Sequence, residues 1–352
     1  MTLKKKFKII IIIALILIIL GGTWAYLVSP VSRKDKEGIE VEIKSGIGTE
    51  KIASTLKEKG LIKSKLLFIV YVKTSGKKSL KADTYLLNKS MSLKQIVKEL
   101  EEGSDYNPDL VKLTFKEGER ITDYAKVIAN NTNNSYDDVI KFINNKEYVK
   151  TLITKYWFLT DKILDENIYY PLEGYLAPDT YHFDNKDVKI EDIITTMLDQ
   201  EEKRLEKYKD TISSDPHKYI TMASIAELEG TKLDNKKMIV GIFNNRLKAN
   251  MNLGSDVTTY YGLQVAMTSD LTTEQFASSN GYNTRAADMR GKLPVGPIDS
   301  PGEEGLEASI NPTQNDYLYF VADKHGKVYY SKTLDEHNKK IAEIKNNGDW
   351  IW

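Results

Sequence analysis

The chain has 352 residues, its 50 Lys and Arg side chains balance 50 Asp and Glu, and it contains no cysteine. This length allows two or three domains, and the balanced charge gives no sign of a nucleic-acid-binding protein. Without cysteine there are no disulfides, thiolate zinc sites or thiol nucleophiles, and the four histidines show no metal-binding spacing. We therefore expect an active site of carboxylates, hydroxyls, amides and arginine, with no metal and no cofactor.

The N-terminus has the pattern of a membrane anchor. A lysine-rich stretch at residues 1–8 precedes the uncharged, aliphatic run 9–28. As a helix this run would extend for about 30 Å, enough to cross a bilayer. Trp24 and Tyr26 stand where an interfacial aromatic belt is expected. The pattern predicts a cytoplasmic tail, a single transmembrane helix over 9–28 and an extracytoplasmic remainder.

A cleaved signal peptide is the alternative interpretation, because residues 9–20 also fit the apolar region of a secretory signal. The residues Thr23, Trp24 and Ala25 make a poor cleavage site. The sequence thus favours an uncleaved anchor in the cell membrane.

A short charged linker, residues 29–37, leads to a small module that we place at 38–110. Alternating strand and helix patterns, separated by glycine-containing turns, predict an α+β fold. The expected elements are a strand at 39–43, helices at 49–59 and 64–74, a strand at 84–87 and a helix at 92–102.

The rest of the chain, 111–345, predicts a larger mixed α/β domain. Amphipathic helices are expected at 188–208, 235–247 and 334–345, and a β-hairpin at 317–330. Polar, Gly- and Pro-rich segments predict ordered loops at 169–183, 253–262, 281–285 and 293–302. Loops on a helical scaffold often carry binding residues, so we expect a cleft built from them.

One predicted helix, residues 219–230, carries two acids in an otherwise apolar run. At 3.6 residues per turn it has two faces that each end in an acid: Ile220, Ala223 and Glu227 on one, and Met222, Ile225 and Glu229 on the other. A helix that is apolar nearly all round belongs in a core, where a carboxyl group is held protonated, as a general acid requires. The alternative is that these acids simply pair with a nearby Lys or Arg.

Several short motifs follow one another in an order that resembles the YceG-like family of endolytic murein transglycosylases (the MltG type). The resemblance covers nearly the whole chain. Its points of match are Glu173-Gly174, Pro178 to Tyr181, Ala223 to Glu229, Phe243 to Leu247, Ser255-Asp256, Tyr261-Gly262, Tyr282 to Thr284, Leu293 to Ile298, Pro301-Gly302, Tyr317 to Asp323 and Glu336 to Asn338.

This resemblance implies that Glu229 is the essential acid and that the module at 38–110 is LysM-like. The candidates for binding substrate or positioning the acid are Glu227, Asn245, Arg246, Asp256, Tyr261, Tyr282 and Asn283. Two positions depart from the family pattern: Val257 stands where proline is usual, and Gly230 where threonine or alanine often follows the acid.

The implied reaction is cleavage of the MurNAc-β-1,4-GlcNAc bond of nascent peptidoglycan, leaving 1,6-anhydro-MurNAc ends and terminating strand elongation. A lytic transglycosylase closes the sugar's own 6-hydroxyl onto its anomeric carbon, so a single Glu can act as acid and then as base. The implied partners are glycan strands, penicillin-binding proteins and the elongation or division machinery. A non-catalytic peptidoglycan-binding scaffold and a hydrolytic muramidase are the competing hypotheses.

Overall fold

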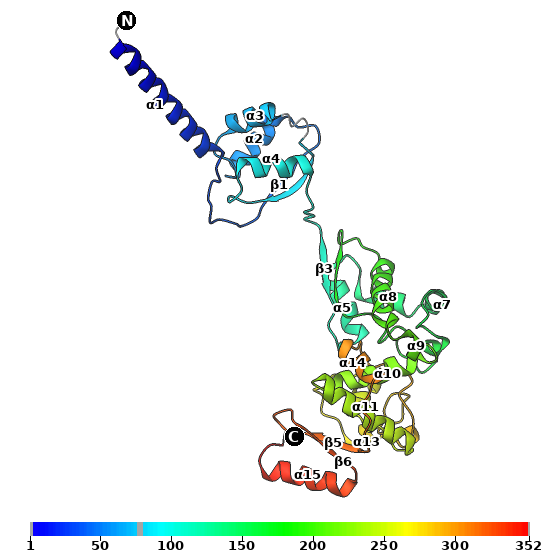
Figure 1. The fold of residues 1–352 in the computed structure, drawn as a ribbon. Helices are drawn as coiled ribbons and strands as arrows, with labels where there is room; N and C mark the ends of the chain where they lie inside the picture. The colour runs from blue at the N-terminus through cyan, green and yellow to red at the C-terminus, as the bar shows by residue number, and fades with distance from the viewer. Residues whose placement is uncertain (1–2, 76–79, 351–352) are drawn as a thin grey trace. The chain divides into compact units, whose positions relative to one another are not determined.

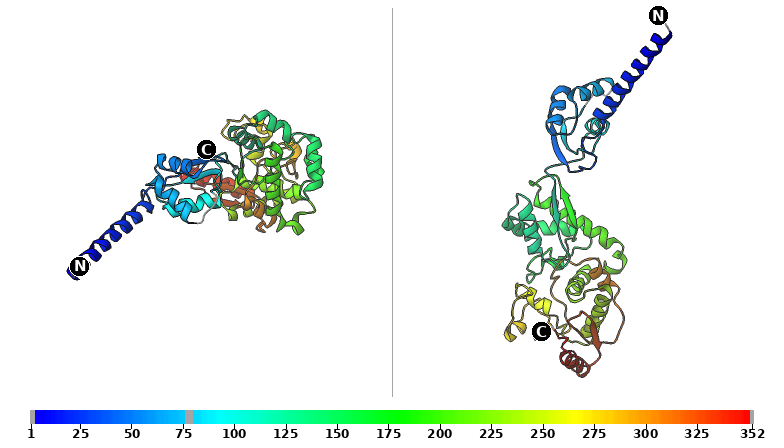
Figure 2. Two further views of the ribbon diagram at one scale, coloured as in Figure 1. Left: turned by 90° about the horizontal axis from the view of Figure 1, so that it is seen from above. Right: turned by 90° about the vertical axis from the view of Figure 1, so that its left-hand side faces the viewer.

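The computed structural model describes residues 3–75 and 80–350 (Figures 1 and 2). The chain divides into two compact units, Met1–Asp109 and Leu110–Trp352. The first unit has one apolar core, and the second unit has two.

The first unit begins with the long helix α1 (Leu3–Val28). Its segment Ile10–Val28 is apolar and long enough to cross a membrane, and none of it is buried inside the protein. Large apolar side chains exposed along a whole helix are unfavourable in water and favourable in lipid. The helix is therefore compatible with the predicted membrane anchor.

The module after α1 has the predicted order of elements. It consists of β1 (Ile39–Ile43), α2 (Thr49–Glu58), α3 (Lys65–Thr74), β2 (Asp83–Leu87) and α4 (Leu93–Glu102). The two strands pair antiparallel, with Ile39 opposite Leu87 and Ile43 opposite Asp83. Alternate strand residues face a core that helices α2 to α4 complete, as the period-2 pattern predicts.

The second unit contains a strand pair that the sequence did not reveal. Strand β3 (Val111–Thr114) pairs antiparallel with β4 (Thr180–Phe183), and Leu113 lies opposite Tyr181. We expected a loop throughout 169–183, and this is wrong at its C-terminal end. The partner strand is far away in sequence, so pairing rather than local propensity makes β4 extended.

Helices and this strand pair together form the first core of the unit. The helices are α5 (Ile121–Asn131), α6 (Tyr136–Ile143), α7 (Lys146–Lys155), α8 (Ile190–Glu206) and α9 (Lys209–Ile212), with a 3-10 turn η1 (Asp161–Leu164).

The remaining elements of the second unit are α10 (Pro216–Glu229), α11 (Leu233–Lys248), α12 (Asp256–Gly262), α13 (Thr273–Phe276), η2 (Ala287–Met289), α14 (Glu303–Ile310), β5 (Tyr319–Ala322), β6 (Val328–Ser331) and α15 (Leu334–Asn346). Of these, α10, α11, α12, α14 and β5 contribute apolar side chains to the second core. Strands β5 and β6 form the predicted hairpin. Helix α12 lies where we expected a loop, because its threonine hydroxyls find partners in a distant segment. Thr258 Oγ1 lies 2.8 Å from Thr284 Oγ1, and Thr259 Oγ1 donates to Asn283 Oδ1 at 2.7 Å.

Helix α10 lies between the two cores of the second unit. Ile220 and Ala223 belong to the first core. Met222, Ile225 and Ala226 belong to the second. The two-faced pattern of residues 219–230 is thereby confirmed. Because both faces are buried, the position of the C-terminal end of α10 is set by packing on two sides.

Candidate functional site

The site centres on Glu229, the last residue of α10. Its side chain is half-buried, and its Oε1 accepts a hydrogen bond of 2.6 Å from the Ser255 hydroxyl. The C-terminal end of a helix carries partial negative charge, and the last turn of α10 contains no basic residue to offset it. The position therefore disfavours a carboxylate.

The surroundings of Glu229 raise its pKa above the usual range of a glutamate. Burial is the main cause, and the negative charge of Asp256 acts in the same direction. The hydrogen bond from Ser255 and the positive charges of Arg246 and Arg285 oppose this rise without cancelling it. The net effect moves the pKa of Glu229 upward, which is the direction that a general acid needs.

Ser255 is itself held from several sides. Its backbone N–H donates to Thr284 Oγ1 at 3.0 Å, and its carbonyl accepts from Thr258 Oγ1 at 2.7 Å. The two threonine hydroxyls lie 2.8 Å apart, and both residues are fully buried. This network fixes the start of α12 against the loop after α13, and so fixes the hydroxyl that contacts Glu229.

Asn283 also connects α12 to the loop after α13, through buried hydrogen bonds. Its Oδ1 accepts from Thr259 Oγ1 at 2.7 Å, and its amide donates to the Ser278 carbonyl at 2.7 Å and the Phe276 carbonyl at 3.0 Å. The residue is fully buried. Its polar atoms thus bind the protein rather than solvent.

Arg246 and Asn245 come from α11. The Arg246 Nε donates to Leu318 O at 2.6 Å, another of its nitrogens donates to Leu253 O, and the guanidinium lies over the Tyr319 ring. The Asn245 amide donates to Asn315 O at 2.9 Å and Tyr317 O at 3.0 Å. These two side chains hold the segment that enters β5, and Arg246 also adds positive charge beside Glu229.

Asp256 and Arg285 form an ion pair that borders Glu229. Their side chains are 49% and 43% exposed, so this part of the site is open to solvent. Of the polar groups that act on Glu229, this pair is the best placed to meet a ligand arriving from outside.

Glu227 points elsewhere, as the helical spacing predicted. Its Oε1 accepts from Lys236 Nζ at 2.8 Å, and its Oε2 accepts the Gly302 N–H at 3.3 Å. The side chains of Glu227 and Lys236 are only 10% and 6% exposed, so each buried charge needs the other. The neighbouring Gly230 is required locally, because a Cβ there would lie 2.6 Å from Lys236 Cγ.

Tyr261 and Tyr282 are buried in the second core. The Tyr261 hydroxyl donates to Glu173 Oε2 at 3.0 Å, and the Ile121 N–H donates to Glu173 Oε1 at 2.8 Å. Burial raises the pKa of Glu173 to about 8. The Tyr282 hydroxyl accepts a hydrogen bond from the Tyr169 N–H at 3.4 Å. These residues connect the two cores of the second unit, and their polar groups have partners inside the protein.

Two residues near Glu229 were missed as site candidates. Ser255 stands beside a named candidate in the Ser255-Asp256 motif, and Arg285 ends the 281–285 loop. No feature of the sequence predicts that either residue lies close to the helix at 219–230. Their chain segments meet Glu229 only through the packing of α10, α11 and α12.

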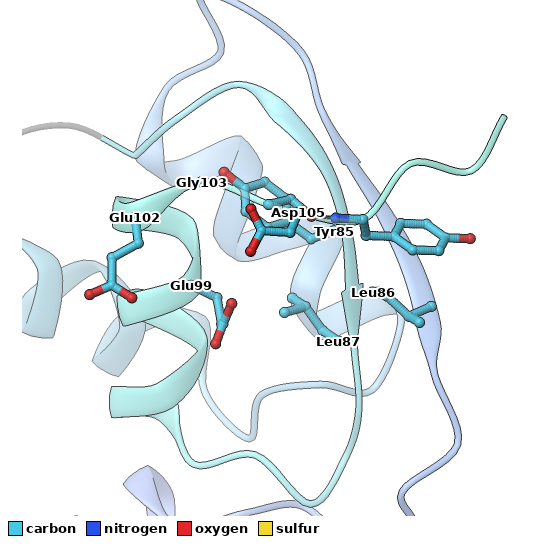
Figure 3. Close-up of a pocket in the computed structure, with 9 residues that line it drawn as sticks. Tyr85, Leu86, Leu87, Glu99, Glu102, Gly103 and Asp105 are labelled. Atoms are coloured by element: carbon cyan, nitrogen blue, oxygen red, sulfur yellow. Dashed lines mark hydrogen bonds between the residues drawn. The ribbon is translucent and has the colours of Figure 1, made fainter. Parts of the chain in front are cut away.

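A polar cavity of about 480 Å³ lies in the first unit, between α4 and β2 (Figure 3). It is lined by Tyr85, Leu86, Leu87, Glu99, Glu102, Gly103, Ser104, Asp105 and Tyr106. Its three carboxylates are exposed to water, unlike Glu229. Such a lining suits contact with a polar ligand rather than acid catalysis.

Known proteins resemble the chain along nearly all of its length. The YceG-like family matches residues 41–343. The endolytic murein transglycosylase of Bacillus subtilis (strain 168) is 35% identical over 339 residues, covering 94% of this chain and 92% of that protein. The endolytic murein transglycosylase of Streptococcus pneumoniae (serotype 2 strain D39) is 32% identical over 367 residues, covering 97% of this chain and 66% of that protein.

A solved structure agrees with these matches. The crystal structure of a YceG-like protein from Listeria monocytogenes aligns with a TM-score of 0.61 at 38% identity, covering 87% of this chain and 99% of that one. The chain belongs to the YceG-like family.

The buried Glu173 should make stability depend on pH. An unfolded glutamate has a pKa near its usual value, whereas Glu173 has a pKa of about 8 in the fold. Between these values the folded state retains a proton that the unfolded state has lost, so stability falls as pH rises, by up to about 1.4 kcal/mol per pH unit.

Glu173→Gln mimics the protonated acid. Its melting temperature should therefore fall less than that of the wild type when the pH rises from acidic values to pH 8. Thermal unfolding followed by circular dichroism measures this decrease. Glu166→Gln, at an exposed position of the same unit, is the matched control and should leave the pH dependence unchanged. An unaltered pH dependence in Glu173→Gln would show that Glu173 is ionised throughout.

Proposed function

We propose that this protein is a membrane-anchored lytic transglycosylase that cleaves the MurNAc-β-1,4-GlcNAc bond of peptidoglycan, with Glu229 as the catalytic residue. The supporting observation is a half-buried glutamate of raised pKa, held by one hydroxyl beside a solvent-exposed ion pair. The names of the two relatives support the same activity.

The environment of Asp256 favours this mechanism over ordinary hydrolysis. Hydrolases of the usual kind need a second carboxylate, free to activate water or attack the sugar. Asp256 is the carboxylate whose charge acts on Glu229, and it is engaged by Arg285. A reaction that needs only one acid–base group fits this arrangement.

In the proposed reaction Glu229 donates its proton to the glycosidic oxygen, and the bond from that oxygen to C1 of MurNAc breaks. The GlcNAc leaves with a free 4-hydroxyl. The carboxylate of Glu229 then takes the proton of the MurNAc 6-hydroxyl as O6 bonds to C1. The product is a 1,6-anhydro end, and Glu229 is protonated again without any water being consumed.

The other candidates divide into two roles in this proposal. Asp256 and Arg285 are exposed and would contact sugar hydroxyl or acetamide groups. Arg246, Asn245, Asn283, Tyr261, Tyr282 and Glu227 have internal partners and would position the acid and its surrounding segments.

We also propose that α1 crosses the cell membrane with its N-terminus in the cytoplasm, so that Glu229 works outside on nascent strands and ends their elongation. The lysines before the apolar segment support this orientation. Penicillin-binding proteins and the elongation or division machinery are the partners expected at that location.

The residues 38–110 are proposed to be a LysM-like accessory module that holds glycan, with catalysis confined to 111–345. The strand–helix–helix–strand order from β1 to β2 supports the first assignment. The polar cavity beside β2 offers a surface for sugar hydroxyls.

The central test is Glu229→Gln. Loss of the proton donor should lower the rate of anhydro-muropeptide release by about 10²-fold or more. The fold should persist, because an amide is easier to bury than a carboxylate. The measurement is product analysis of isolated glycan strands by mass spectrometry. Reducing ends from the wild type would indicate a muramidase, and intact strands would indicate a binding scaffold.

Glu227→Gln is the matched control on the same helix turn. It leaves the buried Lys236 without its full counter-charge, so it should lower the melting temperature while retaining most of the activity. The two variants thus separate catalysis from stability. A stable Glu227→Gln protein with greatly reduced activity would move the catalytic role to Glu227.

Ser255→Ala tests the positioning of the acid. Because the Ser255 hydrogen bond holds the pKa of Glu229 down, its removal should raise that pKa and move the alkaline limb of the kcat/KM profile to higher pH. The maximum rate should fall about tenfold, the scale of one lost hydrogen bond to a charged group. Ser309→Ala removes a comparable buried hydroxyl in α14 and should leave the profile in place.

A chain that begins at Leu110 tests whether the second unit is catalytic without the first, since Leu110 starts the second compact unit. It should still form anhydro ends on isolated strands, with weaker binding and a changed product length distribution. A folded but inactive truncation, checked by circular dichroism, would mean that the module is part of the catalytic site.

A further inference from the structure

Helix α3 presents an apolar face that no described residue of the first unit covers. Leu66 is 70% exposed, more than any other large apolar side chain outside α1 in the described part of the chain. Val70, one turn later on the same side, is 42% exposed. The opposite side of α3 packs into the module core through Phe68 and Val72.

Helix α3 lies beside the end of α1. Tyr71 of α3 and Trp24, Ala25 and Val28 of α1 line one cavity of about 430 Å³, and Val28 packs against the module core. Figure 1 shows α3 on the side of the module where α1 ends. Helix α3 therefore lies at the level of the last turns of α1.

Polar contacts hold α1 and the module together. Lys63 Nζ donates to the Tyr26 carbonyl at 3.0 Å and to Ser29 Oγ at 2.9 Å, and it lies 3.9 Å from the centre of the Tyr26 ring. Lys63 directly precedes Ser64, the residue that caps the N-terminus of α3. The orientation of α3 is thus tied to that of the membrane-compatible helix.

Aromatic side chains at the end of α1 mark the depth of a membrane surface. Trp24 and Tyr26 are 53% and 64% exposed, and such rings concentrate at the boundary between acyl chains and headgroups. Lys65 and Lys73 stand exposed at the two ends of α3. Exposed apolar side chains flanked by lysines, on a helix beside such a boundary, can contact both acyl chains and anionic headgroups.

We propose that α3 lies in the outer surface of the bilayer, with Leu66 and Val70 inserted among the lipid chains and its flanking lysines at anionic headgroups. The proposal rests on the anchor assigned to α1 and is independent of the catalytic chemistry. In this arrangement the first unit rests on the membrane instead of moving freely on the linker after α1.

The absence of cysteine allows a direct test in the full-length protein. A single cysteine is introduced at Leu66 or Val70 and labelled with an environment-sensitive fluorophore. The protein is reconstituted in phosphatidylcholine–phosphatidylglycerol vesicles, and the label then reports its depth in the bilayer. Leu86→Cys is the matched control, because Leu86 is an exposed apolar side chain on β2 of the same unit. Ile16→Cys, in the middle of α1, reports the bilayer interior.

Labels at Leu66 and Val70 should be quenched by lipids brominated in their acyl chains, and aqueous iodide should quench them several-fold less than the label at Leu86. Replacing phosphatidylglycerol by phosphatidylcholine should weaken the lipid quenching, because it removes the anionic headgroups that the flanking lysines contact. The substitution Leu66→Glu should expose a label at Val70 to iodide.

Iodide quenching at Leu66 equal to that at Leu86 would overturn the membrane contact. Protection from both quenchers would also overturn it, and would indicate a protein partner or a second copy of the chain. A label at Ile16 that iodide reaches would overturn the anchor and this proposal together. None of these outcomes depends on whether Glu229 is catalytic.

Discussion

The burial of α10 on two sides is the constraint on which the site depends. Its apolar faces are shared between two cores, so the helix cannot rotate or slide without opening both. The acids at its end are therefore presented in fixed and opposite directions. Glu227 is neutralised by Lys236, while Glu229 is left with a hydroxyl and partial burial.

This division explains how one helix turn can hold both a structural acid and the acid that we propose to be catalytic. A buried carboxylate with a close ammonium partner is stable as an ion. A half-buried carboxylate whose positive neighbours are engaged elsewhere retains a proton more readily. Arg246 is bonded to the carbonyls of Leu318 and Leu253, and Arg285 is paired with Asp256, so neither neutralises Glu229 fully.

The two units differ in how they present their polar and apolar side chains. The second builds a rigid acid site from threonine, asparagine and serine hydrogen bonds between α12 and the loop after α13. The first presents exposed carboxylates in a polar cavity, and an uncovered apolar face on α3. Rigid positioning suits the proposed bond cleavage, whereas exposed polar and apolar surfaces suit the proposed contacts with glycan and lipid.

The sequence alone determined the apolar N-terminal helix, the order of elements in the module, the two-faced pattern of α10 and the C-terminal hairpin. These features arise from periodicity, which acts between residues close in the chain. Strand β4, helix α12 and the meeting of Ser255 and Arg285 with Glu229 were decided only in the tertiary structure. Their partners lie far away in sequence. Strand pairing and buried hydroxyl networks between distant segments leave no local sequence pattern from which they could be predicted.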